Sequence, residues 1–183
     1  MWAIDPGHSE IRFKVKHLAI ANVSGIFKSF HGFAEAQHDT FENAAVSFEM
    51  DTNSIDTNNA VRDNHLRSDL FLDVAVFPTI SFTGVLRSYN VDNYVLEGDL
   101  TMLNRKAPVT FQVEHTGIGK GRFNDVRAGF ELRGKINRKD YGLTVHLLNE
   151  AGNLVVGDDI KIECDVELIQ SSGNTPTGGS QPA

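Results

Sequence analysis

The sequence predicts an all-β fold in which eight antiparallel strands close into a barrel, with a two-sheet sandwich as the alternative arrangement. Apolar and polar residues alternate along most of the chain, as where Ile11, Phe13 and Val15 are separated by charged residues. Strand side chains point to opposite faces in turn, so each run has one buried and one wet face. Half-wet strands favour antiparallel pairing, because parallel strands covered by helices are apolar on both faces.

Seven of the eight predicted strands alternate cleanly, and turn-forming residues separate many of them. These runs are 10–16, 44–50, 80–82, 94–102, 109–115, 126–136 and 160–168. The eighth, 23–36, is less regular. We expect it to bend at Gly25 and Gly32, because glycine inside a strand often marks a bulge or sharp bend.

Two intervals and the end of the chain depart from the alternation. Interval 56–78 starts with asparagines and spaces its apolar residues by three and four, which predicts one or two short helices. Interval 137–152 leaves room for another helical turn. From Ser171 onward Gly, Ser, Thr and Pro dominate. The sequence thus predicts one domain over 1–170, followed by a disordered tail over 171–183.

Composition excludes several classes of partner. The formal net charge is −7 and no segment is basic, which argues against nucleic acid and against lying flat on an anionic membrane. The single cysteine, Cys164, excludes an intramolecular disulfide and a cysteine-rich metal site. No run approaches the ~18 apolar residues of a membrane helix. No secretory leader precedes the first strand, so we expect a cytoplasmic protein, or a periplasmic one if a leader was removed.

An eight-stranded barrel is wide enough to be filled by side chains or to enclose one small ligand. Several small residues share the predicted inward face with phenylalanines. They are Ala44, Gly98, Ala128, Gly134 and Cys164. These residues either leave a tunnel open or simply accommodate the aromatic rings, and periodicity alone leaves both interpretations open.

Eight segments, in chain order, resemble the YceI-like, polyisoprenoid-binding family. They include RDNHL at 62–66 and INRKDYGL at 136–143. The others are 2–13, 15–18, 25–27, 77–82, 96–101 and 157–160. One departure lies after 100–102, where the family has a glycine-containing turn. Here Asn104 replaces the glycine, and asparagine tolerates a left-handed backbone.

The resemblance implies an eight-stranded antiparallel lipocalin-like barrel with short helical segments covering one end. It also implies an apolar tunnel that binds and sequesters or carries a long isoprenoid lipid, such as a polyprenyl chain or a prenyl quinone. No catalytic activity, catalytic residue, metal or cofactor beyond that lipid is expected. The family makes a homodimer plausible, and stable membrane insertion is not expected.

The inward residues of the predicted strands form the expected ligand site, although a one-residue bulge would reverse the face. They are Phe13, Val15, Phe27, Phe48, Ile80, Phe82, Leu96, Leu100, Phe111, Phe130, Ile162 and Val166. Polar candidates for the tunnel mouth are His17, Arg62 and His65. The planar fork of an arginine suits a phosphate or a quinone carbonyl.

Other interpretations remain open at this stage. Arg62, Asp63 and His65 resemble part of a catalytic constellation, but no Gly-x-Ser-x-Gly elbow is present. We favour ion pairs of Arg62 and Asp63 that pin a helical cap to the barrel rim. Likewise, Arg138 is expected to pair with Asp140 and fix a loop. The seven histidines show no metal-ligand spacing. The alternative functions are a lipid-modifying hydrolase or isomerase using mouth histidines, and a protein-interaction module with a packed core.

Overall fold

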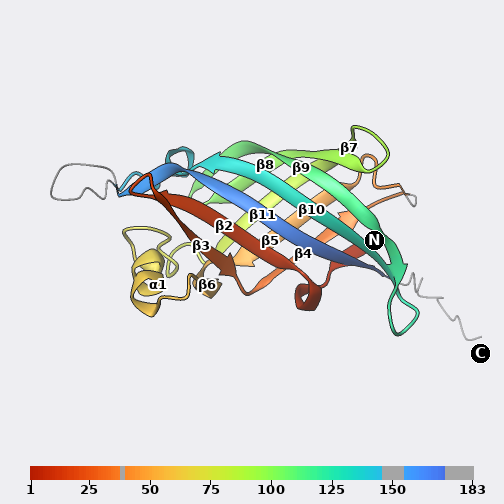
Figure 1. Ribbon diagram of the computed structural model, residues 1–183, viewed down its shortest axis with the longest axis horizontal. Coiled ribbons are helices and arrows are strands. Elements are labelled where there is room, and N and C mark those ends of the chain that lie inside the picture. Colours follow the sequence, from red (N-terminus) through yellow and green to blue (C-terminus); the bar gives the residue numbers. More distant parts are fainter. Residues whose placement is uncertain (38–39, 146–154, 172–183) are drawn as a thin grey trace, which may run out of the picture.

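Eleven strand segments pair into one antiparallel sheet that closes on itself (Figure 1). The computed structural model describes residues 1–37, 40–145 and 155–171. The strands are β1 (Trp2–Ile4), β2 (Glu10–His17), β3 (Ala21–Phe27), β4 (Phe30–Glu35), β5 (Ala45–Asp51), β6 (Ile55–Asp56), β7 (Thr79–Ser88), β8 (Asn93–Met102), β9 (Arg105–Lys120), β10 (Val126–Asn137) and β11 (Val156–Gln170). The helical elements are α1 (Ala60–Arg67) and the 3₁₀ turns η1 (Pro6–His8), η2 (Thr52–Ser54) and η3 (Arg138–Tyr141).

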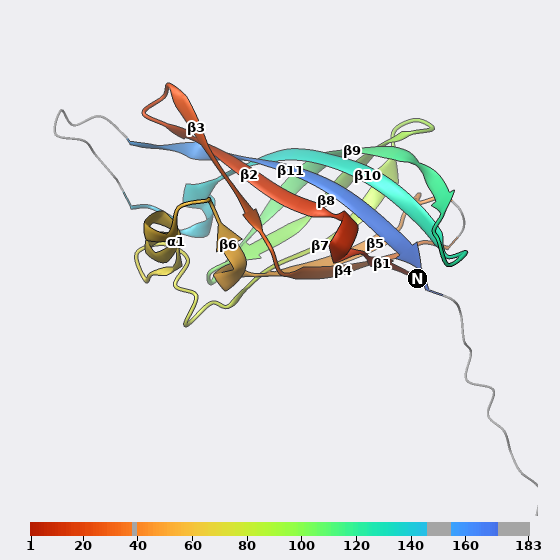
Figure 2. The same cartoon turned by 60° about the horizontal axis from the view of Figure 1, so that its bottom comes forward.

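The ring of strands runs β1-β4-β5-β7-β8-β9-β10-β11 and is closed by pairing of β11 with β1. β2, β3 and β6 continue the sheet from β11. β1 and β2 are two halves of one strand interrupted by η1, and β3 and β4 are two halves of another (Figure 2). The molecule is therefore a closed eight-stranded antiparallel barrel, and the predicted fold class is confirmed.

The predicted bends at Gly25 and Gly32 are wrong. Both glycines lie inside regular pairing, Gly25 opposite Phe13 and Gly32 opposite Phe48. The strand breaks instead at 28–29, where it changes partners. β3 pairs with β2 and β6, whereas β4 pairs with β1 and β5. The glycines are needed for close packing across the sheet rather than for a change of direction.

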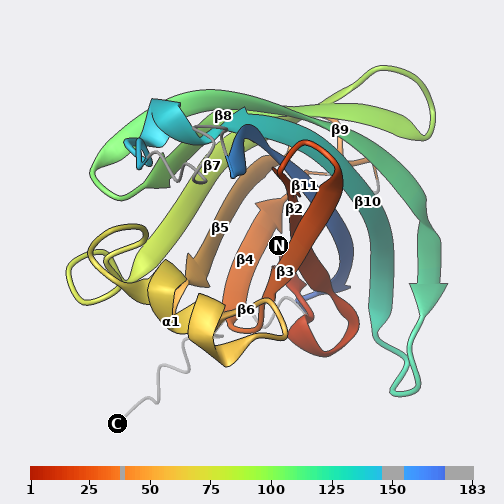
Figure 3. The ribbon, with the colours of Figure 1, turned by 60° about the vertical axis from the view of Figure 1, so that its left-hand side comes forward.

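Helical segments cover one end of the barrel, as predicted (Figure 3). Interval 56–78 holds one α-helix, α1, followed by turns. The side chain of Asn59 caps α1 by accepting a hydrogen bond from the Arg62 N–H at 3.0 Å. η3 begins the second interval; its residues 146–152 lie outside the described part of the chain. β11 ends at Gln170, and the predicted tail beyond Ser171 is also outside it.

The turn between β8 and β9 differs from the prediction in one detail. Met102 pairs with Arg105, so the hairpin has a two-residue loop, and the left-handed backbone falls on Leu103 with φ 55° rather than on Asn104. Tight hairpin turns of the type with only the first central residue left-handed are the II′ class, which normally has glycine there. The resemblance to the family predicted the left-handed residue at Asn104, one position after Leu103, where it lies.

The end of the barrel opposite α1 is sealed by aromatic packing. Phe41, only 1% exposed, lies in the connection between β4 and β5 and is among the residues that line the interior. Its ring centroid lies 5.0 Å from that of Trp2 and 4.8 Å from that of Phe130, the second pair being edge to face. Ala44 and Ala128 are fully buried beside it. At the other end, Leu66 of α1 and Phe71 and Leu72 of the following turns line the interior.

Candidate functional site

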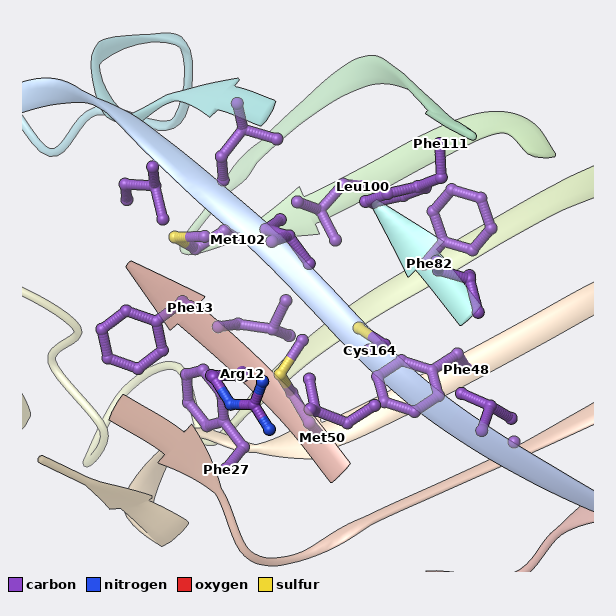
Figure 4. Close-up of a pocket in the computed structure, with 18 of the residues that line it drawn as sticks. Arg12, Phe13, Phe27, Phe48, Met50, Phe82, Leu100, Met102, Phe111 and Cys164 are labelled. Atoms are coloured by element: carbon purple, nitrogen blue, oxygen red, sulfur yellow. The ribbon is translucent and has the colours of Figure 1, made fainter. Parts of the chain in front are cut away.

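A cavity of about 260 Å³ occupies the barrel interior. It is lined by inward side chains of β2, β3, β5 and β7–β11, together with residues of α1 and its following turns (Figure 4). Phe13, Phe48, Phe82 and Phe111 are among the rings that face it. Nearly every lining side chain is apolar, so the interior resembles a hydrocarbon environment more than an active-site cleft.

All twelve residues predicted to face inward line this cavity. The alternation gave the correct face because the pairing is regular along the strands that carry them. A β-bulge does occur in the pairing of β9 with β10, near Gly129, beyond most of the lining residues. That these residues contact a ligand stays a prediction.

Sequence reasoning missed several lining residues. Ile11, Met50 and Met102 share the phase of the predicted residues and could have been found from alternation. Leu66, Phe71 and Leu72 lie in the predicted helical interval. They line the cavity because α1 and its following turns pack against the barrel end, which the local sequence does not predict. Phe41 lies outside any strand and carried no periodic signal.

Glycines in the wall receive phenylalanine rings. A Cβ atom added to Gly25 would lie 2.5 Å from Cζ of Phe13, and one added to Gly84 or Gly98 would lie 2.6 Å from Cζ of Phe82. The rings therefore occupy the space where a neighbouring side chain would be. The sequence left open whether small residues in the wall leave a tunnel or accommodate aromatic rings, and in this barrel both are true. The glycines accommodate the rings, and rings held against the wall leave the bore open.

None of the predicted mouth residues lines the cavity. Arg62 donates to Thr57, from Nε to Oγ1 and from Nη2 to the carbonyl oxygen, both at 2.7 Å. The buried carboxylate of Asp63 accepts from the Thr57 N–H at 3.0 Å and from its hydroxyl at 2.5 Å. The two residues hold α1 against the end of β6, through Thr57 rather than through ion pairs.

The two mouth histidines lie away from any catalytic arrangement in the described structure. His65 is exposed and meets the ring of Phe71 edge to face, at 4.9 Å between centroids. His17 ends β2 and is half-buried. Among the described residues, neither ring is hydrogen-bonded to a serine or a carboxylate. The geometry gives no support to a base-and-nucleophile pair.

Three polar residues, Arg12, Ser47 and Arg138, are among those that line the cavity. The predicted pairing of Arg138 with Asp140 is wrong. Arg138 is buried and donates to Asp158 at 3.0 Å. It also donates to the carbonyl oxygens of Leu143, Val145 and Gly157 at 2.5, 3.0 and 3.1 Å. Asp140 is exposed. Arg138 reaches from η3 to the start of β11 and also provides a donor to the buried carbonyl oxygen of Leu143.

Cys164 faces the cavity from β11. Burial raises the pKa of its thiol to about 12, because an apolar environment disfavours the thiolate. The thiol is therefore protonated at neutral pH and is not an activated nucleophile. It acts as a small apolar side chain in the wall.

One carboxylate cluster lies outside the barrel. Ligand atoms of Asp5, His8 and Glu167 lie within 4.8 Å of one another, a grouping that histidine spacing did not predict. Arg127 donates to Asp5 at 2.9 Å and also to Glu167. The hydrogen bond from His8, and then those from Gly7 and Arg127, lower the pKa of Asp5. The Arg127 guanidinium neutralises these carboxylates, as a bound cation would, and links η1 to β10 and β11.

No helix within residues 1–37, 40–145 and 155–171 is long and apolar enough to cross a membrane. Curated relatives are close in sequence. A protein of Yersinia enterocolitica, UPF0312 protein YE1254, is 38% identical over 140 residues, covering 76% of this chain and 73% of the relative. Protein YceI of Salmonella newport is 37% identical over the same shares.

Solved structures share the barrel. The YCEI protein of Campylobacter jejuni is 28% identical, with a TM-score of 0.74 over 87% of this chain and 91% of its own. BcnA of Burkholderia cenocepacia aligns with a TM-score of 0.77 at 16% identity, over 90% and 98%. A polyisoprenoid binding domain from Saccharophagus degradans aligns at 0.70 and 14%, over 93% and 98%. These last two show the fold alone.

The sequence model that describes the YceI-like domain matches residues 2–168. The match spans the barrel from β1 to β11. The ordered sequence motifs, the close relatives and the shared barrel all agree with it. The chain belongs to the YceI-like domain family.

Proposed function

We propose that this protein binds a long isoprenoid lipid, a polyprenyl chain or a prenyl quinone, inside the barrel and sequesters or carries it unchanged. The observation that carries the proposal is the apolar cavity of about 260 Å³ inside the barrel, with Phe41 buried in its lining. Membership of the YceI-like family and the likeness to a polyisoprenoid binding domain support it.

The energetics favour a long hydrocarbon ligand. An apolar cavity of roughly 150 Å³ in another protein stays dry and takes up benzene, and the cavity here is larger. Burial stabilises by ~0.8 kcal/mol per methylene, so about ten methylenes inside the cavity give a gross gain of ~8 kcal/mol. Ordering the chain and losing its translational freedom offset much of that gain. We expect tight binding that is poorly selective for length and shape.

The lining supports carriage rather than catalysis. In the part of the chain that the structure describes, no aspartate, glutamate or histidine lines the cavity. A general acid or base needs such a group within hydrogen-bond reach of the substrate. No cofactor other than the bound lipid is proposed. The homodimer and the compartment, cytoplasmic or periplasmic, stay predictions.

Native mass spectrometry of freshly purified protein tests the proposal. An additional mass that matches a prenyl lipid, together with stoichiometric uptake of added prenyl quinone by delipidated protein, is expected. A matched variant, Cys164→Phe, fills the bore and should reduce uptake, whereas exposed Lys161→Phe on the outer face should not. Persistent absence of the extra mass, with no uptake of quinone, would overturn the proposal.

The enzymatic alternative has its own test. Replacement of His17 and His65 by alanine leaves the cavity lining intact. Prenyl esters are incubated with the parent protein and the double variant, and products are separated by chromatography. We expect no turnover by either protein. Turnover by the parent that is lost in the variant would favour a hydrolase.

A further inference from the structure

Of the large apolar side chains that are exposed in the described part of the chain, five lie at the end of the barrel that carries α1. They come from the β2–β3 hairpin, from α1 and from the turns after α1, which Figures 1 and 2 place at the same end. We define the apolar rim as Leu18, Ile20, Val61, Leu70 and Val76, which are 37%, 83%, 82%, 56% and 63% exposed.

The hairpin tip is the clearest part of the rim. Leu18, Ala19, Ile20 and Ala21 are consecutive, uncharged and exposed. An exposed run of this kind is a defect in a soluble fold unless it serves a function. The tip is also strained, because Leu18 and Ala19 have φ of 51° and 59° and the Ile20 N–H donates to the carbonyl of His17 at 3.2 Å. Asn-Gly is the pair that such a turn prefers.

The cavity opens beside the rim. Lining residues near this end, such as Phe13, Val15 and Phe71, are half-buried although they point inward. Phe41 and Trp2 at the other end are almost fully buried. A ligand therefore enters and leaves next to the exposed apolar side chains, and a water-insoluble ligand crosses less water if this end touches the phase that holds it.

We propose that the apolar rim inserts into the surface of a phospholipid bilayer and places the cavity mouth against the acyl chains. The inference rests on the proposed function for the identity of the cargo. The bilayer is one of neutral phospholipid, because the chain carries a net charge of −7 and Asp69 and Asp73 flank the rim residue Leu70. Insertion by apolar side chains does not need anionic lipid, in contrast to attachment by a basic patch.

The test uses two variants of the full chain. The rim variant carries Leu18→Asn, Ala19→Gly and Ile20→Ser. These changes remove the exposed apolar side chains of the tip and place asparagine and glycine, which tolerate a positive φ, at positions 18 and 19. In the control variant, Val91→Ser and Phe123→Ser remove apolar side chains that are 85% and 86% exposed, close to the 83% of Ile20, from hairpins away from α1 (Figure 1). Flotation with phosphatidylcholine vesicles and transfer of a prenyl quinone from those vesicles are measured for each.

We expect the parent and control proteins to float with the vesicles and the rim variant to lose at least tenfold in flotation and in transfer rate. Uptake of quinone delivered in detergent should be equal in all three, and the rim variant should be at least as stable to urea. Absence of flotation by the parent, or equal flotation by the rim variant, would overturn the inference. So would flotation that requires phosphatidylglycerol, or loss of a dimer in the rim variant.

The two proposals fail separately. If no protein takes up quinone from detergent, the proposed cargo is wrong, and flotation still tests the rim by itself. If uptake from detergent is normal and the parent does not float, the barrel binds its lipid and the rim has no affinity for a bilayer.

Discussion

The ring of Phe111 on β9 lies over the α-carbon of Gly134, its cross-strand neighbour on β10. A Cβ atom at Gly134 would lie 2.8 Å from Cε1 of that ring and closer still to Cδ1. Phe111 in turn meets Phe82 edge to face, with 5.7 Å between centroids. The width of the bore at this level depends on the missing side chain of one glycine.

Replacing Gly134 by alanine should therefore push the Phe111 ring into the cavity. We expect about 1–3 kcal/mol of destabilisation from overpacking and roughly tenfold weaker binding of a prenyl quinone, measured by fluorescence titration. The matched control is Gly119→Ala, since nothing lies within 4 Å of a Cβ at Gly119. Unchanged binding in Gly134→Ala would show that the ring does not set the width of the bore.

Removal of the Asp63 carboxylate should loosen α1. Asp63→Ala leaves the buried N–H and hydroxyl of Thr57 without their acceptor, which costs about 1–3 kcal/mol per buried group. The free energy of unfolding from urea titration should fall by this order, and hydrogen exchange should rise first in α1. The exposed neighbour Asp69→Ala should have little effect. Equal stability of the two variants would contradict the assigned role.

Arg138 and Lys139 share Asp158 as a partner but should differ in their contributions. Arg138→Ala removes a buried guanidinium and leaves the buried carbonyl oxygen of Leu143 without its donor, so we expect a loss of about 1–3 kcal/mol. Lys139→Ala removes an exposed contact to Asp158 at 2.6 Å, for which about 0–1 kcal/mol is typical. Thermal unfolding of both variants checks the order, and a larger loss in Lys139→Ala would reverse our assignment.

Stability should decline in alkali. Burial raises the pKa of Cys164 and that of Tyr141 to about 12 in the folded protein. The unfolded chain releases these protons at lower pH, so the stabilisation is complete below about pH 8.5 and is lost as the pH rises toward 12. Urea unfolding at pH 7 and pH 10.5 measures the difference. Cys164→Ala should show a smaller decline, and an identical decline would exclude the thiol as a cause.

The sequence was most informative where structure is local. Period two identified which side chains of β2, β5, β7 and β9 face inward, because pairing keeps each strand in a fixed phase. The alternation did not predict positions whose residue type is determined by packing against a residue distant in sequence. Gly25 was taken for a bend, but it receives the ring of Phe13 from the neighbouring strand, and no local pattern contains that information.

The polar residues illustrate the same limit. Arg138 bonds with Asp158, 20 positions away, rather than with its neighbour Asp140. Arg62 and His65 were expected at the mouth because their residue types suit a head group, yet Arg62 is committed to Thr57. Which buried carbonyl or hydroxyl needs a donor is decided by the assembled barrel, so residue type alone could not assign these partners.

Among the described residues, Phe41 packs against Trp2 and Phe130 at one end of the barrel, whereas lining side chains near α1 such as Phe13 and Phe71 are only half-buried. Under the proposed function, a prenyl chain would have to enter tail first, and its polar end would be the last part to leave the water or the membrane. Isoprene units beyond the depth of the bore would remain outside. Such a barrel would bind its cargo by the tail and leave the head group accessible to the molecule that receives the lipid.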